Sequence, residues 1–320
     1  YLCAFIKTFI FSMGKLLTVG TMAFDSIETP FGKVEKTMGG SANYICLSAS
    51  AFDIEQAIVS VVGEDYPQEY MHTLTSREIN TSQVEIIKGG KSFYWSGKYH
   101  TDMNSRDTLD TQVNVLDHFI PKISSDFCDA QYLMLGNLHP QIQLSVIEQM
   151  KQRPTLIVLD TMNYWINNTW EKLLEVIKKV DVITINDEEA IQLTQEYSLP
   201  RAAKKIMSFG AKYVIIKKGE HGAMLFHQDE IFFAPAIPIL DVCDPTGAGD
   251  TFAGGFIGYL AKTEDISFNN MKNAIVYGAT LASFCVEKFG AERMISLTKD
   301  EVLRRLFYLK ELTQFDIKIA

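Results

Sequence analysis

Short apolar runs alternate with amphipathic stretches between about residue 130 and residue 217. The runs are continuous and rich in β-branched side chains, which is typical of strands buried on both faces of a parallel sheet. The stretches between them have the spacing of helices with one apolar face. We therefore expect βαβ units and a layered α/β fold, in which helices flank a mostly parallel central sheet. The expected strands are residues 16–19, 58–62, 132–135, 156–159, 182–185 and 214–216, and the expected helices are 141–150, 170–180 and 187–195.

Two segments of the N-terminal third break this rhythm. Residues 24–38 and 91–109 alternate polar with apolar or aromatic side chains, a pattern typical of antiparallel strands with one solvent-facing side. We expect them to form a small β lid that projects from the main body. Phe93, Trp95 and Tyr99 alternate on one face of this lid. They would either cover a substrate or form a lid-to-lid contact in a homodimer, and both alternatives remain open.

Beyond Asp250 the pattern becomes almost entirely helical, with expected helices at 251–260, 271–286 and 299–312. We expect a single domain over residues 13–320. Residues 1–12 form an apolar run that is too short to cross a bilayer, which takes about 20 residues. We interpret this run as an extension upstream of the fold, with a short membrane or partner contact as the alternative.

Composition excludes several classes of function. The chain has 320 residues, is 47% hydrophobic and carries a formal net charge of −9, so it lacks the basic footprint that a nucleic-acid binder needs. We expect neither a nucleic-acid nor a membrane partner. The five cysteines are scattered and show no metal-ligand spacing, which favours a reducing, cytoplasmic location.

One segment carries most of the chemistry: DPTGAGDTFAGGF, from Asp244 to Phe256. Pro245 and the glycines prevent a regular helix before Ala248, whereas the residues from Asp250 onward have helical spacing. A glycine-rich turn that leads into a helix leaves backbone N–H groups unpaired, and with the helix dipole they form an anion site. An aspartate beside that anion suits phosphoryl transfer, where it can accept the proton of an acceptor hydroxyl without a raised pKa.

The segment resembles, nearly letter for letter, the C-terminal signature of the ribokinase/PfkB family of carbohydrate and nucleoside kinases. Gly39-Gly40-Ser-Ala-Asn43 is similar to the family's N-terminal signature, and Asn186-Asp-Glu-Glu189 to its Asn-x-x-Glu motif. The resemblance runs from Met13 to the C-terminus, with the motifs in the family's order. It implies a ribokinase-like fold and an ATP-dependent sugar kinase.

The resemblance also implies site residues. Asp250 would be the catalytic base, and the amides of Gly247, Ala248 and Gly249 would form the anion hole. The residues implied for substrate binding are Asp25, Gly39, Gly40 and Asn43. Those implied for the nucleotide are Asn186, Lys217, Gly219, Gly222 and, beside the adenine, Asn273. The implied cofactors are ATP and Mg²⁺, with Glu189 on the metal side. The loops around Asp244 and Gly290 resemble the site of a monovalent cation, K⁺, in some members.

Some of these residues have plainer interpretations. Glu189 follows a buried strand, where a magnesium ion expects a carboxylate, but acidic residues in a first helical turn also cap the helix. Asp25 follows the first strand, where an aspartate can also be an ordinary turn residue. Arg106, in the lid, would contact a substrate oxygen or be solvated.

The leading hypothesis is a kinase that transfers the γ-phosphate of ATP to a hydroxymethyl group of a sugar or sugar acid. The alternative within the same class is a nucleoside kinase of the adenosine or inosine/guanosine type. An alternative of another class is a nucleotide-binding regulator that has lost turnover.

Overall fold

The computed structural model describes residues 14–314, so the predicted extension 1–12 lies outside the described residues. A nine-stranded sheet forms the centre of the molecule, in the order β13-β12-β11-β10-β9-β8-β1-β4-β5. The bounds of its strands are β1 Lys15–Val19, β4 Glu55–Gly63, β5 Ile79–Ile87, β8 Tyr132–Leu135, β9 Leu156–Asp160, β10 Val182–Asn186, β11 Tyr213–Lys217, β12 Ala223–His227 and β13 Glu230–Ala234.

The six strands expected from the apolar runs are all present and run parallel to one another. Their central residues are buried, as a sheet covered on both faces requires. The sheet continues beyond β11 as an antiparallel hairpin, β12–β13, which was not predicted from the sequence. The sheet is therefore mostly parallel, as expected, with an antiparallel edge.

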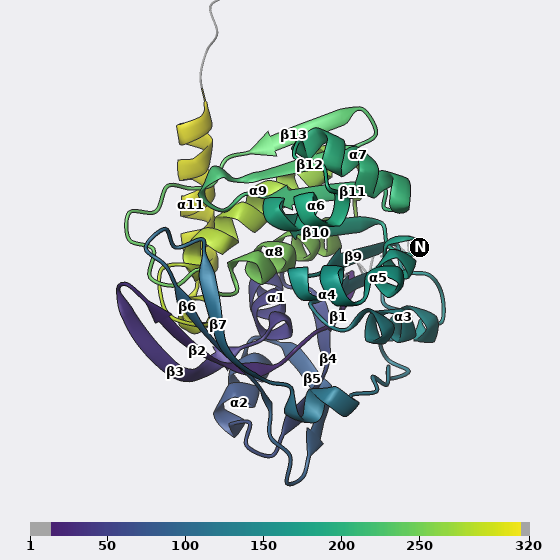
Figure 1. Ribbon diagram of the computed structural model, residues 1–320, viewed down its shortest axis with the longest axis vertical. Coiled ribbons are helices and arrows are strands. Elements are labelled where there is room, and N and C mark those ends of the chain that lie inside the picture. The colour runs from purple at the N-terminus through teal and green to yellow at the C-terminus, as the bar shows by residue number, and fades with distance from the viewer. Residues whose placement is uncertain (1–13, 315–320) are drawn as a thin grey trace, which may run out of the picture.

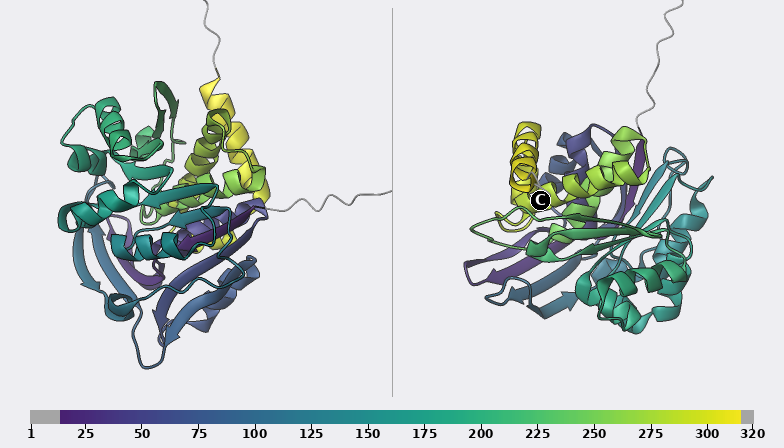
Figure 2. Two further views of the ribbon diagram at one scale, coloured as in Figure 1. Left: turned by 90° about the vertical axis from the view of Figure 1, so that its right-hand side faces the viewer. Right: turned by 90° about the horizontal axis from the view of Figure 1, so that it is seen from above.

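Helices cover both faces of the sheet (Figures 1 and 2). On one face lie α3 Pro140–Gln149, α4 Asn163–Asn168, α5 Trp170–Ile177, α6 Asp187–Thr194 and α7 Leu199–Phe209. On the other lie α1 Ser41–Ala49, α8 Ala248–Thr263, α9 Phe268–Cys285, α10 Glu292–Ser296 and α11 Lys299–Thr313, and α2 Gln68–Ser76 packs near β5. Two apolar cores result, one on each side of the sheet. The helical C-terminal region predicted after Asp250 is confirmed as α8 to α11.

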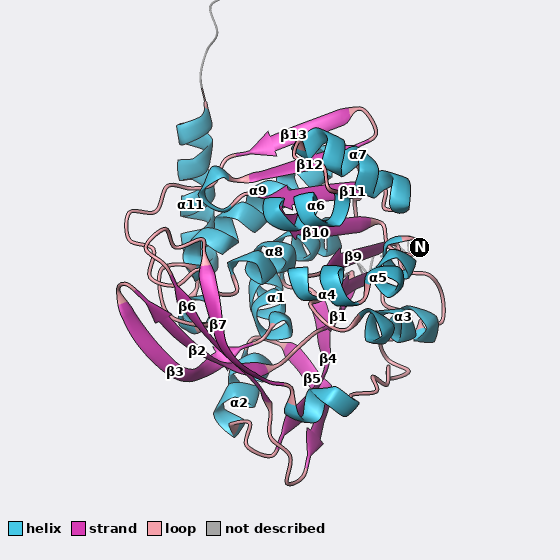
Figure 3. Cartoon of the chain, in the orientation of Figure 1, coloured by secondary structure: helices cyan, strands magenta, loops and turns pink. Residues whose placement is uncertain are grey.

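The two alternating segments contribute a separate four-stranded sheet, which we call the lid (Figure 3). Its order is β3-β2-β6-β7, with β2 Ala23–Thr29, β3 Gly32–Gly39, β6 Phe93–Tyr99 and β7 Arg106–Gln112. The pairs β2–β3 and β6–β7 are antiparallel, but β2 and β6 run parallel. The prediction of antiparallel strands was therefore wrong for the β2–β6 pair. Strands β4 and β5 of the main sheet lie between the two hairpins along the chain, so β6 does not follow β3 through a tight turn and can run in the same direction as β2.

No helix within residues 14–314 is long and apolar enough to cross a membrane. The cysteines of this part of the chain, at positions 46, 128, 243 and 285, are all unpaired. Three polar residues, Asp160, Asn186 and Lys217, end the adjacent strands β9, β10 and β11 at the carboxyl edge of the main sheet. Ligands of open α/β sheets bind at this edge.

Candidate active site

The turn that precedes α8 presents free backbone amides. Gly247 has φ +76°, and a β-carbon there would lie 2.4 Å from the ring of Tyr44. The amide of Ala248 donates to the Pro245 carbonyl at 3.2 Å. The amides of Gly247, Gly249 and Asp250 have no backbone partner within the described residues. The unpaired amides are therefore not the same as the predicted 247–249 set. The Ala248 amide is used within the turn, and the Asp250 amide is unpaired in addition to those of Gly247 and Gly249.

Lys217 lies directly beside this turn. Its Nζ donates to Asp160 Oδ1 at 3.1 Å, and a β-carbon on Gly249 would lie 3.1 Å from the same Nζ. Burial works to lower the pKa of Lys217, but the carboxylates of Asp160, Glu189 and Asp250 outweigh it and raise the pKa. The ammonium is therefore charged and sits between the acidic edge of the sheet and the amides of the turn.

Asp250 stands at the centre of an acidic cluster. Its Oδ1 is buried without a hydrogen-bond partner in the described chain. Burial raises the pKa of Asp250 to about 8, the charge of Asp160 adds to the effect, and Lys217 opposes it. A base role does not require this shift, and the shift could not be predicted from the sequence, because the carboxylates that converge here come from separate elements. A raised pKa brings the carboxyl into the range of a general base near neutral pH.

A second group of predicted residues lies where the lid strands β2 and β3 meet α1. Asp25 on β2 is buried, and burial together with the charge of Asp244 raises its pKa to about 7 against a hydrogen bond from the Gly40 amide. Asn43 on α1 donates to the Gly39 carbonyl at 2.6 Å and to Tyr66 Oη at 2.9 Å. The Asn43 Oδ1 is buried and unpartnered among the described residues. A carboxylate and an unpartnered amide oxygen can both accept hydrogen bonds from hydroxyl groups.

The close contact between Gly39 and the Asp25 carboxyl predicts a specific effect of substituting Gly39. A β-carbon there would lie 2.0 Å from Asp25 Oδ2, so the Asp25 carboxyl must move. We expect Gly39→Ala to raise the KM for the phosphate acceptor at least about 10-fold, since a misplaced catalytic group typically costs about that much or more. The KM for ATP should change by less than about 3-fold. Steady-state kinetics in each substrate check this, and an equal loss for both substrates would contradict the assignment of Asp25 to the acceptor.

Asn186 and Glu189 form a capping box at the start of α6. Glu189 N donates to Asn186 Oδ1 at 2.7 Å, and Asn186 N donates to Glu189 Oε2 at 2.9 Å. Burial raises the pKa of Glu189 to about 7. The capping interpretation thus holds for Glu189, but it uses only one carboxylate oxygen. The other carboxylate oxygen and the Asn186 side-chain nitrogen take no part in the capping box.

The loop after β11 contains the other predicted nucleotide residues. Gly219 and Gly222 have φ +52° and +89°, and a β-carbon on Gly222 would lie 2.1 Å from the Ala234 carbonyl oxygen. Only glycine fits such a close backbone approach in this conformation. Asn104 of the lid donates to Glu220 Oε2 at 2.9 Å, so the lid reaches across to this loop.

Asp244 joins the two loops that resemble a monovalent-cation site. Its Oδ1 accepts from the Thr246 amide and its Oδ2 accepts from the Gly290 amide, both at 2.8 Å. Burial raises the pKa of this carboxyl. Asp244 therefore holds the turn before α8 against the end of α9.

Asn273 lies apart from these residues. Helices α8 and α9 pack against each other at Gly255 and Gly278, and Asn273 lies beside the Tyr259 hydroxyl. Tyr259 is nine residues beyond Asp250, about 13 Å along the helix axis. Asn273 therefore lies away from the turn, on the N-terminal part of α9, and its place beside the adenine stays a prediction.

Two features of the site were not predicted from the sequence. Asp160 is buried and accepts from both Lys217 Nζ and Thr184 Oγ1. Asp160 could have been predicted as a site residue, since an aspartate that ends a buried parallel strand lies at the carboxyl edge of the sheet. Thr246 Oγ1 donates to Tyr99 Oη at 3.2 Å. Tyr99 is thus buried against the turn rather than free for a partner lid, and nothing in the local sequence indicates that contact.

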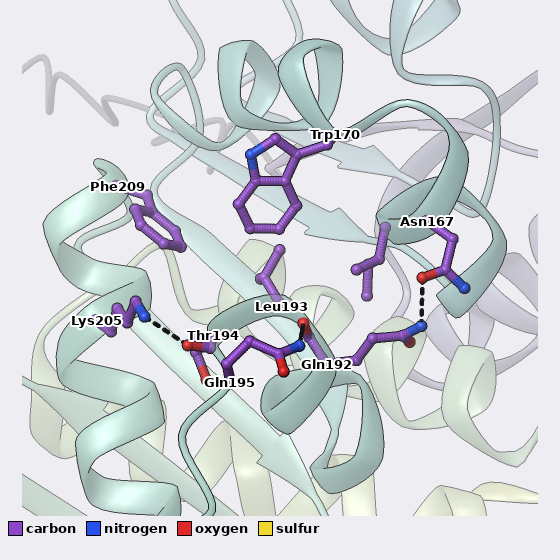
Figure 4. Close-up of a pocket in the computed structure, with 9 residues that line it drawn as sticks. Asn167, Trp170, Gln192, Leu193, Thr194, Gln195, Lys205 and Phe209 are labelled. Carbon is purple, nitrogen blue, oxygen red and sulfur yellow. Dashed lines mark hydrogen bonds between the residues drawn. The ribbon is translucent and has the colours of Figure 1, made fainter.

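A separate cavity of about 320 Å³ lies between α4, α5, α6 and α7 and includes none of the predicted site residues (Figure 4). Its polar groups pair with one another: Lys205 Nζ donates to the Thr194 carbonyl, and Gln192 Nε2 donates to Asn167 Oδ1. The crevice therefore offers few free polar groups that converge on a ligand.

Comparison with known proteins agrees with this geometry. A model described as pfkB family carbohydrate kinase matches residues 13–298. The ribokinase of Staphylococcus aureus is 32% identical over 313 residues, covering 90% of this chain and 95% of that protein. The cytidine kinase of Thermococcus kodakarensis is 29% identical over 245 residues, covering 76% and 87%. The structure of Arabidopsis thaliana ribokinase complexed with ribose and ATP has a TM-score of 0.73 and 19% identity, covering 92% and 98%.

Proposed function

The chain belongs to the pfkB family of carbohydrate kinases and is an ATP-dependent kinase that acts on an alcohol group, and we propose that this alcohol is the hydroxymethyl group of a sugar or sugar acid. The observation that carries the proposal is the pair of unpartnered buried oxygens, Asn43 Oδ1 and Asp250 Oδ1. Together with the Asp25 carboxyl, they offer acceptors for several hydroxyl groups. A non-catalytic regulator has no comparable support.

The reaction follows from these positions. Asn43 and Asp25 hold the ring hydroxyls, so that the hydroxymethyl oxygen lies beside Asp250. As this oxygen bonds to the γ-phosphorus, the bond from phosphorus to the ADP oxygen breaks, and the hydroxyl proton passes to the Asp250 carboxylate. The free amides of Gly247, Gly249 and Asp250 stabilise the charge on the transferring oxygens, as preorganised donors do. Asp250 is the general base in this proposal.

The residues on the nucleotide side fit ATP and Mg²⁺, which are consistent with this family. Lys217 and the loop at Gly219 would contact the phosphates and ribose. No group of three or more His, Cys, Asp or Glu side chains within residues 14–314 forms a ready metal site, and Mg²⁺ is commonly held by one or two carboxylates plus substrate phosphates. Glu189 would supply one such carboxylate, and the ion would neutralise charge on the phosphates.

The direct test is ADP release by the purified protein across a panel of sugars, sugar acids and nucleosides. Release that depends on one acceptor class supports the proposal, whereas ATP binding with no release across the whole panel would count against it. A parallel arm with tetramethylammonium in place of K⁺ tests the monovalent cation that we propose at the Asp244 and Gly290 loops. The expected result there is a lower rate without K⁺.

A nucleoside is the second candidate, and Trp95 favours it. Trp95 is the direct cross-strand neighbour of Asp25, so both side chains lie on the same face of the lid. Its indole lies over Gly97, where a β-carbon would come within 2.2 Å of the ring, and its Nε1 donates to Thr108 Oγ1 at 3.3 Å. A flat, half-buried indole beside Asp25 is suited to stacking on a base, worth about 1–3 kcal/mol.

Trp95→Ala separates the two candidates. For a nucleoside acceptor we expect a rise in KM of about 5- to 100-fold, from the loss of stacking. For a free sugar we expect less than about a 3-fold change. Phe31→Ala is the matched control, because Phe31 is another lid aromatic but is 68% exposed. An unchanged KM for every nucleoside in the panel would remove the nucleoside candidate.

Two further proposals concern the oligomeric state and the cellular location of the enzyme. Phe31 and Leu109 are exposed apolar residues of the lid, and they support a homodimer through that sheet. The unpaired cysteines support a cytoplasmic location.

A further inference from the structure

The lid touches the body of the protein on both sides of the phosphate-transfer region. Tyr99, at the end of β6, meets Thr246 just before the free amides of the turn. Asn104, in the loop between β6 and β7, meets Glu220 in the loop after β11. The first contact is on the turn that binds the transferring group, and the second is on the loop assigned to the nucleotide. The segment between them therefore spans the line along which phosphate moves.

Arg106 is the cation of this segment. It begins β7 and pairs directly with Tyr99 across the two strands. Directly opposite residues of an antiparallel pair project from the same face, with their β-carbons about 4.5–5.5 Å apart. Because the Tyr99 hydroxyl points to Thr246, the Arg106 side chain leaves the lid on the side that faces the body.

Arg106 lies close enough to the acidic cluster to act on Glu189. Its side chain makes no ion pair or hydrogen bond within residues 14–314, although the cluster on the body contains Asp160, Glu189 and Asp250. The field of Arg106 helps to hold down the pKa of Glu189, which burial raises, and that of Tyr99. The one cation inside the cluster, Lys217, is already bonded to Asp160. Arg106 is thus an exposed guanidinium without an ion pair in the described chain, on the lid face that turns toward these carboxylates.

We propose that Arg106 is a catalytic residue whose guanidinium binds the oxygens of the γ-phosphoryl group during its transfer, rather than an acceptor-binding or solvated residue. The proposal rests on the kinase function above. The guanidinium keeps its protons throughout, since the hydroxyl proton goes to Asp250, and it only stabilises charge as the bond to ADP breaks. Its planar fork suits phosphoryl oxygens, and its place between Thr246 and Glu220 puts it on the phosphate path rather than over Asn43.

The experiment compares Arg106→Met, Arg106→Lys and the control Lys98→Met. Lys98 is the adjacent lid cation, but it pairs with Glu28 at 2.6 Å and so is engaged away from the body. We expect Arg106→Met to lower kcat at least about 100-fold, because arginines placed on a transferring phosphoryl group contribute about 10³–10⁵ in rate. Both KM values should stay within about 3-fold, Arg106→Lys should restore part of kcat, and Lys98→Met should resemble the wild type.

A binding measurement accompanies the kinetics. ADP with Mg²⁺, aluminium fluoride and acceptor mimics the transferring group, and calorimetry should show at least about a 10-fold loss of this trapped complex in Arg106→Met, with ADP affinity unchanged. A rise in acceptor KM with unchanged kcat would overturn the proposal in favour of acceptor binding. Unchanged kinetics and trapping would overturn it in favour of a solvated side chain. A wild-type protein that turns over no acceptor would instead refute the kinase proposal, so the two failures are distinguishable.

Discussion

Replacing Asp250 with Asn is expected to lower kcat by a factor of about 10²–10⁴, the range that a positioned general base contributes. Asn has nearly the same shape but cannot take the hydroxyl proton. The free amides of Gly247 and Gly249 and the ammonium of Lys217 remain, so ATP affinity should change by less than about 3-fold. Steady-state kinetics and calorimetric titration with ATP measure the two quantities. Retention of more than about a tenth of the wild-type kcat would contradict the role of Asp250 as the base.

Thermal stability is the control for folding in this variant, and its direction follows from the same geometry. The carboxyl of Asp250 has a pKa raised to about 8, whereas Asp in an unfolded chain titrates at about 3.9. Between these values the folded protein holds a proton that the unfolded chain has released, so the free energy of unfolding falls as the pH rises. The asparagine side chain does not titrate, so Asp250→Asn should raise Tm at about pH 8 and raise it less at about pH 5.

Replacing Gly247 with Ala is expected to have the second large effect. An alanine at φ +76° costs about 1–2 kcal/mol in backbone strain, and its β-carbon would lie 2.4 Å from the rigid ring of Tyr44. The turn must shift, and the amides lose their alignment. Loss of one such donor typically costs about 3–4 kcal/mol in the transition state, so we expect kcat/KM for ATP to fall about 100- to 1000-fold.

Gly249→Ala is the matched comparison for Gly247→Ala. Gly249 is not at positive φ, and the nearest atom to an added β-carbon is the end of the flexible Lys217 side chain, at 3.1 Å. We expect less than about a 10-fold loss in kcat/KM from this alanine. Gly249→Val, with two more methyl groups beside Lys217, should be clearly worse. Equal kinetics for Gly247→Ala and wild type would show that the amides of this turn do not bind the transferring phosphate.

Much of the fold could be predicted because the parallel strands are buried on both faces and read as continuous apolar runs. The β12–β13 hairpin was missed although its apolar strands flank a short turn at Gln228, which has φ +50°. The apolar pattern of the strands does not show whether the last strands of a parallel sheet pair in an antiparallel direction. The direction of β6 beside β2 depends in the same way on the intervening chain.

The candidate site divides similarly. Asp250 and Gly247 lie in one continuous motif, so their neighbourhood is local and could be predicted. Tyr99 and Thr246 are 147 positions apart, and their contact exists only once the lid lies over the turn. The position of Asn273 relative to the turn also depends on tertiary packing, because the packing of α9 on α8 decides which turn of the helix reaches the site. The raised pKa of Asp250 likewise depends on carboxylates from three separate elements.

Proton-coupled ³¹P NMR of the product, made from ATP, Mg²⁺ and the best acceptor of the panel, tests the central claim most directly. Transfer to a hydroxymethyl group predicts a phosphomonoester triplet, split by the two protons of the CH₂ group, that is absent with Asp250→Asn. A doublet would place the phosphate on a secondary alcohol. Inorganic phosphate alone would mean that water, and not a bound hydroxymethyl group, is the acceptor, and either result would contradict the account.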